Sequence, residues 1–267
     1  MTTSTQWQLT REAAERYESI ITPAIALPAA VPLVEQGAIR PGEFVLDVGC
    51  GTGAVARVAS TKAGPTGRVL GTDINAGMVS VASEILAPAG GAPMEFRQAD
   101  ACSLGLEDDS VDVVLSGLMV QFVPEKQLAV TEMRRVVRPG RRVAVSVWGP
   151  LNECPYFERV THAIERHLGP DVAKGFYVAF TLGKIDDARA LLTGAGFQDI
   201  SSTSPEINVK LGPVNEFIPR HLSATPVAGA FAGASEATRA TLVRDAAEAL
   251  GNATTFPFRM HVVIGIK

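Results

Sequence analysis

Short apolar runs alternate with amphipathic segments between residues 43 and 148. The apolar runs predict buried strands, and the segments between them repeat apolar residues every three or four positions, which predicts helices. Such a strand and helix alternation is typical of a doubly wound parallel α/β sheet. The predicted strands are 43–48, 68–72, 94–98, 111–116 and 142–148, and the predicted helices are 54–61, 78–86 and 125–137.

Helical regions flank this repeat. Apolar residues at helical spacing before residue 20 predict a short amphipathic helix, and the proline-rich stretch 20–34 leads to a helix ending near Gly37. Helices are predicted at 156–167 and 186–195, and strands at 200–211 and 261–266. The length favours one domain over residues 1–267. Its expected parts are a helical cap at 1–39, a core at 40–150, remaining core elements at 151–212, a helical lid inserted at 213–252 and a terminal strand at 253–267.

Composition narrows the possible partners. Hydrophobic residues make up 46% of the chain and charged residues 19%, as in packed globular proteins. A net charge of −4 disfavours a nucleic-acid or anionic-membrane surface. The three cysteines form no CxxC or Cys/His cluster, which predicts neither a disulfide framework nor structural zinc. The stretch 20–34 is broken by three prolines and too short to span a bilayer, and no signal peptide is expected. We expect a cytoplasmic protein, monomeric or homodimeric, without membrane or nucleic-acid partners.

A glycine-rich turn follows the first predicted strand. The segment Gly49-Cys50-Gly51-Thr52-Gly53-Ala54 matches the loose dinucleotide fingerprint, which is weak on its own. Asp47 precedes this turn, where a carboxylate repels a pyrophosphate and favours a cation. Asp73 ends the second strand and suits two ribose hydroxyls, and Asp100 follows the third strand, where it suits an exocyclic amine. Three acids at the carboxyl edge of the sheet therefore predict a cationic adenosine, S-adenosylmethionine. A ligand-free turn, with Asp73 and Asp100 as helix N-caps, is the alternative.

The chain resembles the class I S-adenosylmethionine-dependent methyltransferases, in particular the small-molecule, methyltransferase type 11-like group similar to the ubiquinone and menaquinone biosynthesis enzymes. Five motifs carry this resemblance, in the family's order along nearly the whole chain. They are VLDVGCGTG at 45–53, GTDIN at 71–75, QADA at 98–101, DVVLSGLMVQFVP at 112–124 and EMRRVVRPGRRVAVSVW at 132–148.

The resemblance implies a Rossmann-like, doubly wound sheet of seven strands, with the last strand antiparallel between the fifth and sixth. It also implies that 40–150 is a cofactor-binding core. By resemblance, the three glycines let the backbone approach the methionine and ribose, an acid binds the ribose, and apolar side chains enclose the adenine. The implied cofactor residues are Tyr17, Asp47, Gly49, Cys50, Gly51, Gly53, Asp73, Ile74, Met78, Asp100, Ala101, Ser116 and Gly117.

Methyl transfer by in-line displacement needs few catalytic side chains, because positioning in a dry pocket supplies much of the acceleration. His221 and Tyr17 are candidate bases, and Gln121 is a polar side chain in an apolar run. A surface position for His221 is the alternative. No carboxylate pair follows the fourth strand, so we expect no metal.

We expect the cap and the lid to enclose a small, fairly apolar acceptor, either a phenol- or quinol-like oxygen or carbon, or an amine. A non-catalytic cofactor-binding or scaffold protein is an alternative. An NAD-dependent oxidoreductase is another, disfavoured by Asp47, Asp100 and the lack of a Tyr-x-x-x-Lys pair. The identity of the acceptor and the atom that is methylated stay open.

Overall fold

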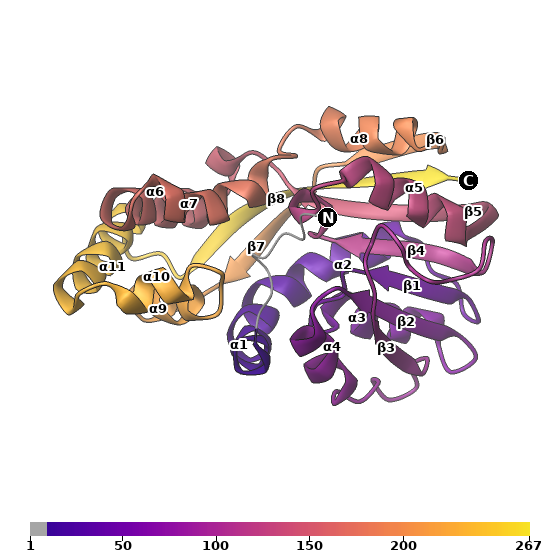
Figure 1. Ribbon diagram of the computed structural model, residues 1–267, viewed down its shortest axis with the longest axis horizontal. Coiled ribbons are helices and arrows are strands. Elements are labelled where there is room, and N and C mark those ends of the chain that lie inside the picture. The colour runs from indigo at the N-terminus through magenta and orange to yellow at the C-terminus, as the bar shows by residue number, and fades with distance from the viewer. Residues whose placement is uncertain (1–9) are drawn as a thin grey trace.

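The computed structural model describes residues 10–267, which contain eight strands in the order β3-β2-β1-β4-β5-β8-β6, with β7 paired to β8 (Figure 1). Strands β1 to β5 are parallel, and β8 runs antiparallel between β5 and β6. The predicted α/β class and the antiparallel position of the last strand are thereby confirmed. The strands are β1 Phe44–Val48, β2 Arg68–Asp73, β3 Met94–Gln98, β4 Val111–Gly117, β5 Val137–Trp148, β6 Gln198–Thr203, β7 Glu206–Lys210 and β8 Thr255–Ile266.

The eighth strand arises because the segment expected to be one strand, 200–211, is divided in two. Ser204 and Pro205 separate β6 from β7, and Pro205 has no N–H to donate to a ladder. Strand β6 pairs with the second half of β8 inside the main sheet, while β7 pairs with the first half. The ribbon of β7 and β8 extends away from the sheet toward a group of helices (Figure 1).

Hydrophobic side chains cover both faces of the sheet, which explains why its strands read as continuous apolar runs. Val45 and Val69 pack on the face covered by α2 and α3, while Leu46 and Leu70 pack on the face covered by α5 and α8. Helix α4 packs against β2 and β3. These helices are α2 Leu27–Gln36, α3 Ala54–Ala63, α4 Ala76–Ser83, α5 Lys126–Val136 and α8 Ile185–Gly194.

The N-terminal region is one helix of 26 residues, Arg11–Gln36, rather than two pieces broken by prolines. It consists of α1 Arg11–Arg16, a π-helical segment Tyr17–Ala26 and α2. Pro23 lies in the π-helical segment, whose wider turns relieve the clash of the proline ring with the preceding turn. Within residues 10–267 this helix alone is long and apolar enough to cross a membrane, judged by length and composition, so the expectation that this stretch is too short to span a bilayer was wrong. Its buried face belongs to the main hydrophobic core, and the core helix of a globular protein can be equally long and apolar.

A group of helices lies beyond the end of the main sheet, where the β7–β8 ribbon reaches it (Figure 1). Helix α11 packs on both α6 and α9, so α6 and α7 form one helical group with the segment 213–252, and we call this group the lid. The buried side chains of this lid are continuous with the core beneath α2 and α3. The lid helices are α6 Pro155–Leu168, α7 Pro170–Tyr177, α9 Val214–Ser223, α10 Ala228–Gly233 and α11 Glu236–Leu250, and single 3₁₀ turns occupy Val120–Phe122, Leu151–Glu153 and Val178–Phe180.

Candidate active site

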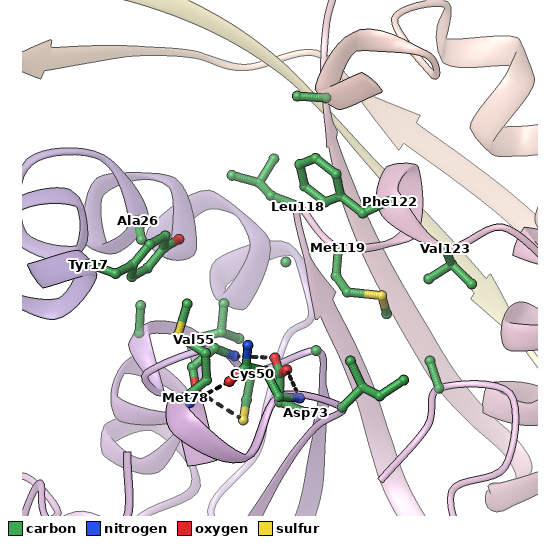
Figure 2. Close-up of a pocket in the computed structure, with 18 of the residues that line it drawn as sticks. Tyr17, Ala26, Cys50, Val55, Asp73, Met78, Leu118, Met119, Phe122 and Val123 are labelled. Carbon is green, nitrogen blue, oxygen red and sulfur yellow. Dashed lines mark hydrogen bonds between the residues drawn. The ribbon is translucent and has the colours of Figure 1, made fainter. Parts of the chain in front are cut away.

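A cavity of about 710 Å³ opens at the carboxyl ends of the parallel strands. Open α/β sheets bind their ligands at this edge, where the loops after the strands converge. The N-terminal helix lies on one side of the cavity, and the loop after β4 lies on the other. Figure 2 shows Tyr17 and Ala26 on the first side, Leu118, Met119 and Phe122 on the second, and Cys50, Asp73 and Met78 at the base.

The glycine turn is held tightly against β2. The backbone N–H groups of Gly49 and Cys50 both donate to the Thr72 carbonyl, at 2.7 and 2.9 Å. Gly49 and Gly53 have φ of +72° and +89°. A Cβ at Gly49 would collide with the Met119 side chain, and one at Gly53 would lie 3.0 Å from the Phe96 ring. Both positions therefore require glycine for packing as well as for backbone conformation.

The three glycines differ in their relation to the cavity. Gly49 and Gly51 line it, while Gly53 lies behind it as the N-cap of α3. A Cβ at Gly51 would meet no atom within 4 Å, so the turn is open on the cavity side. The backbone of Gly51 is consequently accessible to a ligand.

Asp73 is a fixed carboxylate at the end of β2. Its Oδ2 accepts a hydrogen bond from the Gly51 N–H at 2.8 Å, and its Oδ1 accepts one from the Asn75 N–H at 2.9 Å. Burial raises the pKa of this carboxyl, and the two backbone donors oppose that effect. Each oxygen keeps accepting capacity on the cavity side, so Asp73 fits a pair of neighbouring hydroxyls.

Apolar side chains and a second acid complete this end of the cavity. Ile74, 39% exposed, and the buried Met78 line it beside Asp73. Asp100 and Ala101 follow β3 and also line it, and Asp100 Oδ1 accepts the Cys102 N–H at 2.8 Å. Neither acid is a helix N-cap: Asn75 caps α4, and the segment after Asp100 is a turn.

Three other predicted site residues lie away from the cavity wall. Asp47 points to the α2 and α3 face beneath the glycine turn, and neither of its oxygens has a hydrogen-bond partner within residues 10–267. Burial raises the pKa of Asp47 to about 8; the nearby Ala56 N–H opposes this rise, and the charge of Asp73 adds to it. Ser116 and Gln121 are fully buried, and their polar side-chain atoms have no partner in the described chain.

Aromatic rings surround the lid side of the cavity. Trp148, Phe157, Phe176 and Phe180 line this part. His221 also lines this part of the cavity and is only 2% exposed, so it does not lie on the surface. Burial lowers the pKa of His221 to about 3, so its imidazole is neutral at physiological pH.

Tyr17 lies on the N-terminal helix and lines the cavity near Asp73 (Figure 2). Burial, followed by the charges of Asp73 and Glu18, raises the pKa of its hydroxyl to about 12. Tyr17 therefore keeps its proton at neutral pH and offers a hydroxyl rather than a phenolate.

Sequence reasoning missed Ser146, a cavity residue of β5. Its Oγ is fully buried and has no hydrogen-bond partner in the described part of the chain. Ser146 lies two positions before Trp148, so both side chains point to the same face of the strand. A polar residue in phase with a cavity tryptophan at the end of an apolar strand is the signal that could have found it.

Acidic side chains line the cavity, but no cationic side chain of the described residues does. Among residues 10–267, no lysine or arginine lines it, whereas Asp73, Asp100 and Glu125 do. No group of three His, Cys, Asp or Glu side chains within those residues could hold a metal ion. The fold and this site, with an acid after β2 beside a glycine turn and an antiparallel strand next to β5, define a class I methyltransferase architecture.

Comparison with known proteins identifies the family. Residues 46–145 match the methyltransferase domain family. The chain is 36% identical over 163 residues to an arsenite methyltransferase of Halobacterium salinarum, and this match covers 61% of the chain but 39% of that protein. It is 33% identical over 165 residues to the ubiquinone/menaquinone biosynthesis C-methyltransferase UbiE of Cupriavidus pinatubonensis, covering 60% of the chain and 68% of that protein. The chain belongs to the S-adenosylmethionine-dependent methyltransferase family.

A solved structure supports the fold assignment. The phosphoethanolamine N-methyltransferase 2 of Haemonchus contortus, in complex with S-adenosyl-L-methionine, superposes with a TM-score of 0.62 at 18% sequence identity. The superposition covers 98% of this chain and 58% of that one. The lid and the N-terminal helix are therefore included in the shared architecture.

Proposed function

We propose that this protein transfers a methyl group from S-adenosylmethionine to a small and largely apolar acceptor. The observation that carries the proposal is a single cavity with a fixed carboxylate and an open glycine turn at one end and an aromatic enclosure at the other. S-adenosylmethionine would supply an electrophilic methyl group on a sulfonium. The protein's contribution is then to hold the acceptor in line and to exclude water.

The cofactor end offers the groups that such a ligand needs. Asp73 would accept the two ribose hydroxyls, with Ile74 and Met78 against the adenine and Asp100 with Ala101 at its edge. The backbone of Gly49, Cys50 and Gly51, with Gly117 and the Tyr17 hydroxyl, would lie along the methionine. Asp47, Gly53 and Ser116 would act from behind the wall, through packing beneath the glycine turn and the end of β4. All of these residues except Asp47, Gly53 and Ser116 line the cavity, and this position supports their proposed roles.

The acceptor end disfavours a molecule with a localised negative charge. A carboxylate or phosphate buried there would lack a paired cation from the described residues, and unpaired buried charge is costly. Aromatic rings favour a planar, apolar acceptor, such as a phenol, a quinol-like ring or an aromatic amine.

Arsenite is a weaker candidate as the acceptor. Trivalent arsenic is a soft centre that thiolates bind, by the same preference that governs soft metals. Cys50 and Cys102 line the cavity, but the Cys154 thiol is buried elsewhere and donates to the Arg259 carbonyl at 3.5 Å. The three thiols are therefore not gathered at one point, and we favour an organic acceptor.

Calorimetric titration with S-adenosylhomocysteine, with NAD in parallel, tests the cofactor assignment. Asp73→Asn removes a charged acceptor of hydroxyl hydrogen bonds, and we expect affinity for the thioether to fall by roughly 10- to 100-fold. Asp171→Asn is the matched control, because Asp171 is an exposed carboxylate of the lid paired with Lys174. Unchanged affinity in Asp73→Asn, or binding of NAD in place of the thioether, would contradict the proposal.

Turnover separates the enzyme from a cofactor-binding scaffold. The protein would be incubated with S-adenosylmethionine and a panel of phenols, quinols and aromatic amines, and methylated products identified by mass spectrometry. A product with one of these acceptors supports the proposed reaction. Tight binding of S-adenosylhomocysteine without any product across the panel would favour the scaffold alternative.

A further inference from the structure

Tyr156 and His221 form a buried hydrogen-bonded pair beside the acceptor end of the cavity. The Tyr156 hydroxyl lies 2.8 Å from His221 Nδ1. Tyr156 is fully buried and His221 is 2% exposed. His221 lines the cavity, while its other nitrogen, Nε2, has no hydrogen-bond partner within residues 10–267. One edge of the imidazole is therefore tied to the lid, and the other is available to a ligand.

The surroundings of this pair are aromatic. The rings of Phe157, Phe176 and Phe217 lie 5.7 to 5.8 Å from the His221 ring, measured between centroids. Tyr156 in turn packs against Phe256 and Phe258 as well as Phe217. Aromatic rings cannot replace an oxygen or nitrogen as acceptor for the Tyr156 proton, so His221 Nδ1 is its acceptor in the described chain.

This geometry selects one tautomer of His221. If Nδ1 carried the proton and donated to the Tyr156 oxygen, the Tyr156 O–H would be a buried donor with no acceptor, which is costly. If the Tyr156 O–H donates to Nδ1, both atoms are satisfied and the imidazole proton resides on Nε2. The second arrangement leaves an N–H group, and no lone pair, on the cavity side.

We propose that Tyr156 is a positioning residue that fixes His221 with its proton on Nε2, so that His221 donates a hydrogen bond to the methyl acceptor rather than acting as its base. The inference rests on the proposed function, because it assumes that the acceptor occupies this end of the cavity. It narrows the acceptor to an acidic hydroxyl conjugated with a carbonyl, whose anion spreads its charge over a planar system and accepts a hydrogen bond. Such an acceptor needs no enzymic base, since its ionised, nucleophilic form exists in solution at neutral pH.

Nitrogen-15 NMR of the ligand-free protein tests the tautomer directly. Long-range proton–nitrogen correlations distinguish the two neutral tautomers and the imidazolium, and His221→Gln identifies the His221 signals by their loss. We expect the Nε2–H tautomer at pH 7. The Nδ1–H tautomer, or an imidazolium, would overturn the inference. Methyl transfer in the acceptor panel would still stand in that case, so this failure is distinct from failure of the proposed function.

Tyr156→Phe tests the positioning role. The nearly isosteric change removes only the hydroxyl, so the Nδ1 resonance should move toward that of a nitrogen without a hydrogen bond. It also assigns His221 if the His221→Gln protein does not fold. An unchanged Nδ1 resonance would show that Tyr156 does not fix the ring.

A coloured acid, 2-hydroxy-1,4-naphthoquinone, serves as the acceptor probe, because it carries both carbonyls and an ionised hydroxyl at pH 7. Its binding would be measured with S-adenosylhomocysteine present. Gln places an amide N–H near the position of Nε2, so His221→Gln should retain affinity within about threefold, whereas His221→Leu should lose about tenfold or more. Equal losses in the two variants, or no binding to the wild type, would contradict the donor role or the acceptor class.

Discussion

Replacing Asp47 with asparagine should remove the part of the pH dependence of stability that the ionisation of Asp47 causes. Asp47 is 0% exposed at the end of β1, and neither carboxylate oxygen has a hydrogen-bond partner in the described chain. Burial raises its pKa from an ordinary value near 3.8 to about 8. The folded protein therefore binds a proton at Asp47 that the unfolded chain has already released at neutral pH.

Proton linkage fixes the direction of this pH dependence. Between about pH 4 and pH 8 the native state holds a proton at Asp47 that the unfolded state has released. The contribution of Asp47 to the free energy of unfolding is therefore fully present below pH 4 and is lost as the pH rises through the folded pKa. Each pH unit within that window costs about 1.4 kcal/mol, so the whole window is worth on the order of 5 kcal/mol. Asparagine cannot ionise, so Asp47→Asn should match the wild type near pH 4 and exceed it by several kcal/mol near pH 8.

Urea denaturation at intervals from pH 4 to pH 9 would measure this difference, since subtracting the variant from the wild type cancels the other titrating groups. Asp112→Asn is the matched control on the neighbouring strand β4. Burial alone would raise the pKa of Asp112, but the Phe44 N–H and Arg138 outweigh it and the pKa is lowered. That variant should lose stability most clearly at neutral pH. A pH profile of Asp47→Asn parallel to the wild type would refute the reasoning.

Two further pairs of substitutions test packing and charge at the two ends of the sheet. Gly53→Ala should lower the free energy of unfolding by about 2–4 kcal/mol, because the backbone is left-handed there and the Phe96 ring lies close. Gly105→Ala, also at positive φ but in open space, should lower it by about 1–2 kcal/mol. Thermal or urea unfolding measures both losses, and equal losses would show that the Phe96 ring moves aside. Arg142→Met leaves the buried Glu43 with fewer partners and should lower the free energy of unfolding by about 1–3 kcal/mol. The loss should exceed that of Arg141→Met, because Arg141 is the more exposed of the two arginines. An equal or smaller loss in Arg142→Met would contradict this ranking.

The parallel core and the grouping of the glycine turn with Asp73 and Asp100 at one cavity could be predicted from the sequence for a physical reason. Strands buried on both faces need uninterrupted apolar runs, and the turn after β1 needs glycine where φ is positive. The carboxyl edge then collects residues that follow successive strands, so Asp73 and Asp100 reach one cavity although they are far apart in sequence. Local pattern and topology together determine this part.

The positions of Asp47, Ser116 and Gln121 relative to the cavity needed the structure. Successive residues of a strand alternate between faces, so Ser116 and Gly117 cannot both line a cavity on one side of β4, and it is Gly117 that does. The same alternation in β5 brings Ser146 to the cavity. The extent of the lid also needed coordinates, because α6 packs against α11 through contacts between residues far apart in sequence.

Buried carboxylates have arginine partners at one end of the sheet and none at the other, and this difference indicates the charge of the ligand. At the end where β1 and β4 begin, Glu43 and Asp112 are paired with arginines. At the other end, Asp47 has no partner and Asp73 has only backbone donors, while no lysine or arginine of the described chain lines the cavity. An acid buried without a charged partner costs stability, and such violations concentrate at functional sites. Asp47 keeps its proton at neutral pH, so Asp73 is the carboxylate that can attract a positive charge at this end. No lysine or arginine of the described cavity balances it, and a sulfonium cofactor would do so where the pyrophosphate of a dinucleotide would not.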